Sequence, residues 1–550
     1  MNRKVLSLVL ACSLTFITIL DGCGGTASQG SSAAGSSAVA SSAAGSTAAG
    51  SSAAGPSAAA ENSTVVRIMP VITTHKDNLY DKATNGYVLE CSYDTISLED
   101  VSAKAYPKLN DALKALSELT LKAQEETVNV VKNDADMRKL VTKDLHFSDE
   151  GTIQICRIDE DVFSFFFIAA SYLGGAHPNG GIFYSTYDTK TGEEIQLADV
   201  VKSKKDLIAR VKAKLKESFP DAGFYDLDKS MKDYEEGNSE LNWILTPAGI
   251  TVSFNPDDIA PYAAGVLPVA IRFDEDRELF TGKYKESTGG FVLPVFEAGT
   301  TIMDMDGSGK PSVVKVQCDY EEGNEHYTGL TVSCNNKSYK LDDNIFISYY
   351  AKVVHTKDNR NYVYVFTTGY SDCEELLVFD LKDGNVNYCG AVEAGEPGKM
   401  TADENGEGAA AGNDTESKMT IEKYPITDPD HIALQSRVDA MSTYHIRQYY
   451  KIGDKGLPEA IGEFGDAVET ITLTAKADIP GKSVDIAKNE LKDDVTVKKG
   501  DKITIYRTNG KDTVIFKTDD GKYVALKYES GSQINGKPLE DLFENLFFAG

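Results

Sequence analysis

The stretch at 170–199 constrains the fold more than any other part of the chain. It reads ASYLGGAHPNGGIFYSTYDTKTGEEIQLAD and holds a Gly-Gly pair, a His-Pro-Asn-Gly turn, an alternating strand and a Thr-Gly turn in one run. The run VFSFFFIAA at 162–170 leads into it. That run is too short to span a membrane and is typical of a central buried strand. Together the two segments predict a β-hairpin at the centre of a sheet.

The segments around this hairpin predict a mixed sheet covered by two long helices, an α+β arrangement. Apolar residues at helical spacing predict the helices, and alternating or apolar runs predict the strands. Pro70 is expected to interrupt the first strand. The expected helices lie at 102–132 and 199–219, and the expected strands at 65–74, 86–96, 145–158, 161–172, 180–187, 243–254 and 266–273.

The rest of the chain predicts mainly β structure in a multidomain protein. Short β-rich runs between 312 and 381 suggest propeller-like hairpins, and 393–416 resembles a loop insertion rich in Gly, Glu and Ala. Asn-Gly and Asp-Gly turns within 502–528 predict a small C-terminal β-barrel. The expected units are a signal peptide (1–22), a tether (23–62), an α+β domain (63–285), a β-rich domain (291–476) and the barrel-like domain (477–550).

The N-terminal segment predicts export and lipid anchoring. Arg3 and Lys4 precede an apolar run at 5–20, and Leu20-Asp21-Gly22-Cys23 resembles the lipobox of bacterial lipoproteins. That resemblance implies lipidation of Cys23 and a place on the outer face of the cytoplasmic membrane. A plain cleaved signal and an uncleaved anchor are the alternatives. The Ser-, Ala- and Gly-rich run at 24–60 contains nothing that could form a core and would act as a flexible tether.

The charge of the chain bears on its binding partners, and its cysteines bear on disulfides and metal sites. The formal net charge is -28, which argues against nucleic acid as a partner because nucleic acid is polyanionic. Six cysteines remain after the signal and the lipobox, and fifteen residues separate both Cys318 from Cys334 and Cys373 from Cys389. Disulfides are permitted outside the cytoplasm, and free buried thiols are the alternative. No CxxC motif or Cys/His ligand cluster indicates structural zinc.

No motif predicts a catalytic residue or a cofactor. The seven histidines form neither HxxxH nor HExxH, and GxSxG and P-loop patterns are missing from the sequence. We therefore expect a binding protein more than an enzyme. His177 lies among glycines that would let a partner approach the backbone, and bracing of its own turn is the alternative role. The candidate ligand-binding residues are Gly174, Gly175, His177, Asn179 and Tyr262.

The motifs GGAHPNG at 174–180 and LTPAGITVSFNPDDIAPYAAG at 245–265 resemble one extracytoplasmic family. It includes the RsiV-type lysozyme-sensing anti-sigma factors and the N-terminal region of PdaC-type peptidoglycan deacetylases. The resemblance covers roughly 65–273 and implies an extracellular module associated with the cell wall of Gram-positive bacteria. The anti-sigma factors bind lysozyme, and in the deacetylases the module accompanies a catalytic domain. The motifs of that catalytic domain are lacking here, so its activity is not implied.

A second loop suggests calcium. Asp304, Asp306 and Ser308 place oxygen side chains at alternating positions among glycines, which resembles the loops of FG-GAP and VCBS-type repeats. Ser replaces a usual Asp, so any calcium site would be weak, and a plain turn is the alternative. We expect a surface lipoprotein that binds or senses a cell-wall component or an envelope protein. An envelope enzyme acting on glycan and a calcium-stabilised structural or adhesive protein are the alternatives.

Overall fold

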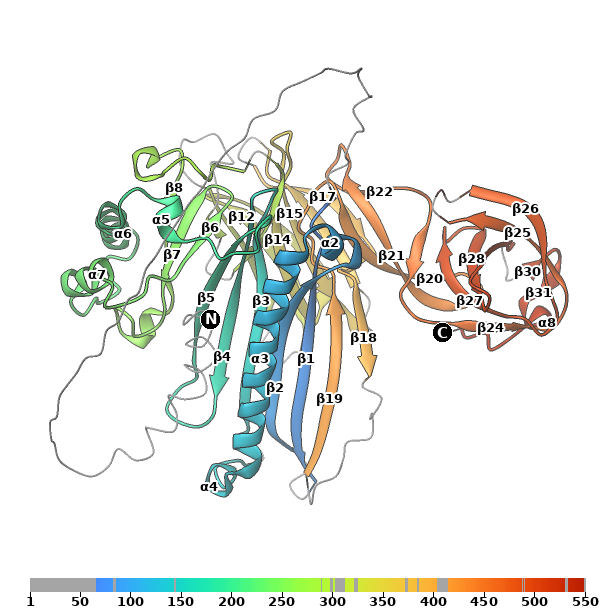
Figure 1. Ribbon diagram of the computed structural model, residues 1–550, viewed down its shortest axis with the longest axis horizontal. Helices are drawn as coiled ribbons and strands as arrows, with labels where there is room; N and C mark the ends of the chain where they lie inside the picture. The colour runs from blue at the N-terminus through green and yellow to red at the C-terminus, as the bar shows by residue number, and fades with distance from the viewer. Residues whose placement is uncertain are drawn as a thin grey trace, which may run out of the picture.

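The computed structural model describes residues 66–82, 86–142, 145–287, 289–296, 300–301, 312–320, 325–370, 374–382, 385–402, 414–486, 488, 490–529 and 533–548. It is a multidomain α+β protein with an N-terminal mixed sheet and helices followed by mainly β sheets (Figure 1). No helix in the described part of the chain is both long and apolar enough to cross a membrane.

The first sheet has seven strands in the order β18-β19-β1-β2-β3-β4-β5. Its neighbours are antiparallel except β2 and β3, which are parallel because a helical crossover joins them. The predicted hairpin is confirmed as β4 and β5, whose register runs from Val162 opposite Asp188 to Ser171 opposite Asn179. Its expected place at the centre of the sheet was wrong, because β5 is the last strand at one edge. The strands are β1 (Pro70–Asp81), β2 (Gly86–Leu98), β3 (Phe147–Ile158), β4 (Val162–Tyr172), β5 (Asn179–Asp188), β18 (Gly398–Ala402) and β19 (Asp414–Lys423).

One face of this sheet is covered by the crossover helices α2 (Asp100–Ala105), α3 (Pro107–Asn133) and α4 (Ala135–Arg138). Leu109, Leu113 and Leu116 of α3 share a core with strand residues such as Phe163 and Phe165. The expected helix at 102–132 is divided at Tyr106, which leaves the helical conformation because proline follows it. Pro70 begins β1 and does not interrupt it.

The segment interpreted as a loop insertion contributes two strands to this N-terminal sheet. β18 and β19 form a hairpin, and β19 pairs with β1 from Ile72 opposite Lys423 to Asp81 opposite Asp414. The loop interpretation of 393–416 was therefore wrong at both ends. Gly and Glu are depleted in strands, and local composition concealed a pairing that a distant strand provides. Because β18 and β19 belong to this sheet, it contains residues from both sides of the domain boundary expected near residue 291.

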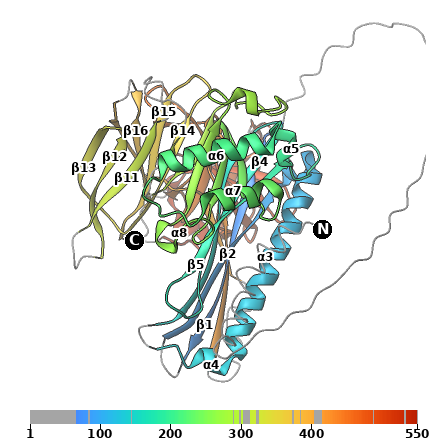
Figure 2. The same cartoon turned by 90° about the vertical axis from the view of Figure 1, so that its left-hand side faces the viewer.

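A smaller layer follows β5. It contains α5 (Leu197–Val200), α6 (Lys204–Ser218), α7 (Leu227–Glu236) and a sheet of β6 (Trp243–Thr246), β7 (Gly249–Phe254) and β8 (Leu267–Arg272). Figure 2 shows α6 and α7 side by side, and Leu207, Val211 and Met231 pack with the sheet in one core. The strand expected at 243–254 is a hairpin turning at 247–248, and α7 was not predicted. Short 3₁₀ turns lie at Tyr262–Ala264 and Arg277–Leu279.

Residues 291–392 form two sheets packed face to face, without propeller blades among the described strands. Val314, Leu330, Val353 and Val363 are fully buried in the core between them. One sheet holds β10 (Thr300–Thr301), β11 (Val313–Tyr320), β12 (Tyr327–Cys334) and β13 (Lys337–Phe346). The other holds β9 (Phe291–Val295), β14 (Ser348–His355), β15 (Asn361–Thr368), β16 (Glu374–Asp380) and β17 (Asn387–Val392).

The C-terminal sheet is joined to the rest by the hairpin β20–β21. The strands expected at 502–508, 512–518 and 523–528 are confirmed as β27 to β29, but the described pairings end at β20 and β26, so no closed barrel is detected. Its elements are β20 (Ile432–Asp439), β21 (Thr443–Ile452), β22 (Pro458–Ala460), β23 (Gly465–Ala467), β24 (Thr472–Ala475), β25 (Ile479–Asp485), β26 (Glu490–Val497), β27 (Lys502–Thr508), β28 (Thr513–Thr518), β29 (Tyr523–Lys527), α8 (Leu539–Leu542) and β32 (Phe543–Glu544), with β30 (Gln533–Ile534) and β31 (Lys537–Pro538) forming a separate pair.

Candidate functional site

The candidate site begins at β5, whose outer edge is covered by side chains and not by another strand. Asn255 accepts a hydrogen bond at Oδ1 from the Ile182 backbone N–H at 2.8 Å. Asn242 donates from Nδ2 to the Ile182 carbonyl at 2.7 Å and accepts from the Tyr184 N–H at 3.3 Å. Two asparagine amides therefore replace the hydrogen bonds that an eighth strand beside β5 would supply. They satisfy the edge and fix the β6–β8 layer against it.

Small residues allow this close approach. A Cβ atom added to Gly181 would lie 2.5 Å from Cγ of Asn255, and one on Gly180 would lie 2.3 Å from the Ala169 carbonyl oxygen. The Gly-Gly pair at 180–181 is thus required by packing. Further along β5, the Tyr184 hydroxyl lies 2.6 Å from Ser253 Oγ, and burial raises the pKa of Tyr184 to about 12.

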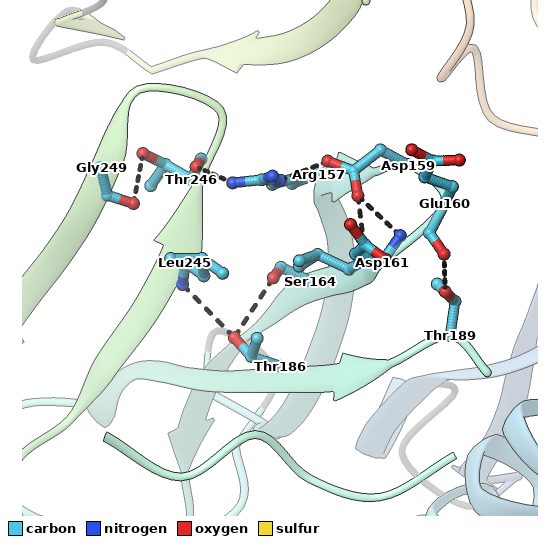
Figure 3. A network of polar contacts seen from close by, with 11 residues as sticks. Arg157, Asp159, Glu160, Asp161, Ser164, Thr186, Thr189, Leu245, Thr246 and Gly249 are labelled. Atoms are coloured by element: carbon cyan, nitrogen blue, oxygen red, sulfur yellow. Dashed lines mark hydrogen bonds and ion pairs between the residues drawn. The ribbon is translucent and has the colours of Figure 1, made fainter. Parts of the chain in front are cut away.

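The other end of β5 is attached by the polar network in Figure 3. Arg157, with a 5% exposed side chain, donates from Nε to Asp159 at 2.6 Å and from Nη1 to the Thr246 carbonyl at 3.0 Å. Thr186 Oγ1 accepts from the Leu245 N–H at 3.3 Å. The β6–β7 hairpin is therefore bonded to β3 and β5 at its turn as well as through the asparagines, which makes the loops beyond it a rigid platform.

The loop between β4 and β5 carries most of the predicted site. Gly174 and Gly175 have φ values of 97° and 123°, a left-handed region that side chains disfavour. His177 is exposed, and its ring stacks on Tyr262 with centroids 3.9 Å apart. The Tyr262 hydroxyl donates to the Pro178 carbonyl at 2.8 Å. Structure thus brings together His177 and Tyr262, which lie far apart in sequence, and leaves the histidine accessible.

The other predicted residues have simpler places. Asn179 is the exposed first residue of β5, and Gly174 packs so that a Cβ there would lie 3.4 Å from Leu140. His177 Nδ1 lies 2.9 Å from the Pro178 carbonyl oxygen. That oxygen can only accept, so Nδ1 donates its proton in this contact. His177 therefore braces its own turn, as the alternative role supposed, and is still exposed to a partner.

Sequence reasoning missed Tyr225 and the acidic turn that holds it. The Tyr225 hydroxyl donates to Asp257 at 3.1 Å, and Asp257 has a positive φ of 69°. Asp258 accepts from the Asn255 N–H at 2.7 Å, and burial raises the pKa of Asp258. The NPDD sequence signalled a turn, but nothing in it indicated which distant tyrosine would lie against it.

Exposed apolar side chains continue this surface past Gly174. Leu140 and Leu145 are 54% and 41% exposed, and Tyr225 is 60% exposed. Thr142 and Leu145 are joined by backbone hydrogen bonds that close the segment after α4. We call the surface formed by Leu140, Leu145, His177, Tyr225 and Tyr262 the distal face. It lies at the end of the first sheet where α4 is found, opposite the end with α2 (Figure 1).

The best-formed cavities in the described part of the chain lie away from the distal face. The two best-formed cavities in the described part of the chain measure about 20 and 10 Å³, and neither is lined by a residue of this face. A small-molecule site is commonly about 300–1,000 Å³. The larger cavity lies between the first sheet and β9 and β14, where Lys352 is among its lining residues. Both have room for water at most, so neither is the size of a small-molecule site.

Several predictions concern metals and cysteines. No group of three or more His, Cys, Asp or Glu residues that could hold a metal ion occurs within the described ranges. Cys318 lies opposite Leu330, and Cys334 lies opposite Val314, so the β11–β12 register does not place these two cysteines across from each other. Cys23, Cys373 and the loop residues Asp304, Asp306 and Ser308 lie outside the described residues.

Comparison with known proteins identifies part of the chain. Residues 198–274 match a family model described as "Protein of unknown function (DUF3298)". No curated protein matches the chain. Among solved structures, a DUF3298 family member from Bacteroides fragilis NCTC 9343 has 14% identity and a TM-score of 0.31, covering 39% of this chain and 94% of that one. A DUF3298 family protein from Pseudomonas aeruginosa PAO1 has 16% identity and a TM-score of 0.29, covering 39% and 95%. Residues 198–274, which run from α5 to just beyond β8, are therefore similar to a DUF3298 domain within a longer chain.

Proposed function

We propose that this protein is a surface-anchored lipoprotein whose distal face binds a cell-wall component or an envelope protein without catalysis. The observation that carries the proposal is the stack of exposed His177 on half-buried Tyr262, which lies beside further exposed apolar side chains. Hydrogen bonds from both residues to the Pro178 carbonyl oxygen hold this stack in place. Rigid, partly exposed aromatic residues supply much of the binding energy in protein interfaces because little side-chain entropy is lost when they bind.

The position of the distal face supports a tethered binding role. The described chain begins at Val66, whose carbonyl accepts a hydrogen bond from Tyr106 beside α2. The distal face lies at the other end of the same sheet. A strand rises about 3.3 Å per residue, so the twelve residues of β1 separate the two ends by roughly 40 Å. The tether of a chain anchored through Cys23 would therefore join the first sheet at the end opposite this face.

The family context supports a partner in the envelope. The DUF3298 domain occurs in RsiV- and PdaC-like proteins. The motif resemblance extends to those groups, one of which senses lysozyme and the other of which acts on peptidoglycan. We propose that the ligand here belongs to the same setting, as wall glycan or as a protein that acts on the wall. The net charge of -28 favours a cationic protein over an anionic polymer.

Pull-down of the tether-free protein on purified wall glycan and on immobilised lysozyme tests this proposal. His177→Ala and Tyr262→Ala are expected to weaken binding about tenfold or more if the stack is central to the interface. Phe547→Ala, which removes a 60% exposed ring in the C-terminal region, serves as the control and should bind as wild type. Retention of neither material would contradict the proposal, and release of soluble glycan fragments by the protein would contradict its non-catalytic character.

A further inference from the structure

A second exposed aromatic surface lies at one end of the two packed sheets between β9 and β17. Four of its large side chains are strongly exposed: Tyr320 at 61%, Ile345 and Tyr370 at 57%, and Ile347 at 41%. Large apolar groups gathered at one place on a folded protein commonly mark an interaction site. We call the surface the aromatic rim and define it by Tyr320, His326, Tyr327, Ile345, Ile347 and Tyr370.

The strand register makes one side of the aromatic rim continuous. Tyr320 lies opposite Tyr327 across β11 and β12, with ring centroids 5.9 Å apart. Tyr327 in turn lies opposite Phe346 of β13, with centroids 5.2 Å apart. Phe346 is buried and anchors its two exposed neighbours, Ile345 and Ile347.

Hydrogen bonds connect the end of β15 and Tyr370 to the rest of the aromatic rim. The Ile347 N–H donates to the Thr368 carbonyl at 2.8 Å, which places the end of β15 beside Ile347. Tyr370 follows two residues later, and its hydroxyl lies 3.1 Å from His326 Nδ1. The rim is therefore one surface assembled from the ends of four strands and held by the sheets beneath it.

The charge around the aromatic rim has a single sign. The described residues of its three connecting segments, 319–320 and 325, 342–347, and 370 with 374–375, include six Asp and Glu residues and no Lys or Arg. Glu325 and Asp343 are exposed beside the rings. Lys340 lies outside these segments and is paired with Asp319 at 3.3 Å and Asp342 at 2.9 Å. Tyrosine faces carry negative electrostatic potential as well, so rings and carboxylates attract the same kind of ligand.

We propose that the aromatic rim binds a cationic polypeptide segment rich in Arg and Lys. Guanidinium or ammonium groups would stack on Tyr320 and Tyr370 while neighbouring carboxylates accept their N–H groups. The carboxylates described there would repel a polyanion, and a neutral glycan would make no use of their charge. This inference concerns a different surface from the distal face and does not depend on the function proposed for it.

Fluorescence anisotropy with labelled octa-arginine and the full-length chain tests the proposal. Tyr320→Ala and Tyr370→Ala are each expected to raise the Kd about three- to tenfold, the effect of losing one cation–π contact. Tyr320→Phe and Tyr370→Phe keep the ring and should stay near the wild-type Kd. Phe547→Ala is the matched control, because Phe547 is equally exposed at 60% but belongs to neither the aromatic rim nor the distal face. Tyr320→Leu and Tyr370→Leu replace the alanine variants if those lower the melting temperature.

Two further measurements distinguish binding at the aromatic rim from general attraction between the acidic protein and the basic peptide. Binding should weaken as salt rises from about 50 to 300 mM, and Glu325→Gln with Asp343→Asn should weaken it again. Equal octa-arginine affinity in the wild-type, alanine and leucine proteins would overturn the proposal, because net charge alone would then explain binding. A ring-dependent interaction with neutral chitin oligosaccharide, unaffected by the two charge variants, would also overturn it in favour of a glycan site.

Discussion

At the scale of single residues, Gly181 leaves the space in which the Asn255 amide bonds to the edge of β5. A side chain there would collide with Asn255, whose amide is hydrogen-bonded to both the backbone N–H and the carbonyl oxygen of Ile182. We expect Gly181→Ala to lower the free energy of unfolding by about 1–3 kcal/mol, the usual cost of overpacking. Urea unfolding followed by Trp243 fluorescence reports this locally, because Trp243 is the only tryptophan and lies at the start of β6.

Gly86→Ala is the matched control, since no heavy atom lies within 4 Å of a Cβ built there. It should change the free energy of unfolding by less than about 0.5 kcal/mol. Equal effects of the two substitutions would show that loss of glycine as such, and not the contact with Asn255, determines the cost.

Asp149 makes a second residue-scale prediction, about pH. It is 2% exposed on β3, and burial raises its pKa, an effect that hydrogen bonds from Tyr93 and Thr127 partly offset. Because its pKa is higher in the folded than in the unfolded chain, the folded state binds this proton more tightly. The resulting stabilisation is complete below the unfolded pKa and is lost as pH rises through the folded pKa.

Asp149→Asn should therefore gain stability relative to wild type as pH is raised from 4 to 7. Urea unfolding at several pH values in that range measures the difference. Asp136→Asn, at a carboxylate whose side chain is 90% exposed, should keep the wild-type pH dependence. If Asp149→Asn also keeps it, burial of Asp149 does not couple folding to pH.

At the scale of elements, the β18–β19 hairpin completes the first sheet from more than 300 residues away. Residues 419–423 of β19 pair with β18 on one side and with β1 on the other, so each backbone N–H there has a place in the ladder. Thr420→Pro should cost about 3 kcal/mol or more, because proline removes an N–H and does not fit a central strand. Thr420→Val keeps strand preference and should be tolerated.

Hydrogen exchange in β1 is the measurement that links cause to effect. In the proline variant the amides of β1 that bond to β19 should lose protection, while those of β27 and β28 in the C-terminal sheet should keep theirs. Unchanged protection in β1 would mean that β19 is not needed to hold the edge of this sheet.

At the scale of the whole molecule, Arg447 connects the C-terminal sheet to the N-terminal one. Its Nη1 lies 3.2 Å from Glu99 Oε1, and its guanidinium lies 4.1 Å from the centre of the Tyr424 ring. Arg447→Ala leaves the partly buried Glu99 without its cation and should cost about 1–3 kcal/mol. Small-angle scattering should show a larger radius of gyration if the C-terminal sheet loosens.

Arg437→Ala provides the comparison on the neighbouring strand β20. Its ion pair with Asp439 spans 3.9 Å with both side chains largely exposed, and such pairs contribute at most about 1 kcal/mol. Unaltered scattering and stability in the Arg447 variant would assign the connection between the sheets to strand pairing alone.

The sequence by itself determined the elements whose signals are local. The β4–β5 hairpin, the strands β27 to β29, and α6 follow from side-chain periodicity and turn residues within a few positions of one another. The same kind of local signal predicted the glycine turn at 174–175 and the turn around His177. Each rests on backbone preferences that neighbouring residues fix, so no distant partner is needed to predict it.

Only the tertiary structure decided what distant segments do together. It placed β19 beside β1, and it stacked His177 on Tyr262 next to the turn that holds Tyr225. It likewise replaced expected blades with two packed sheets, whose strand ends gather Tyr320 and Tyr370. The physical reason is that a strand edge or an aromatic face can pair with many alternatives of similar local pattern. The choice among them depends on burial and hydrogen bonding summed over the whole fold.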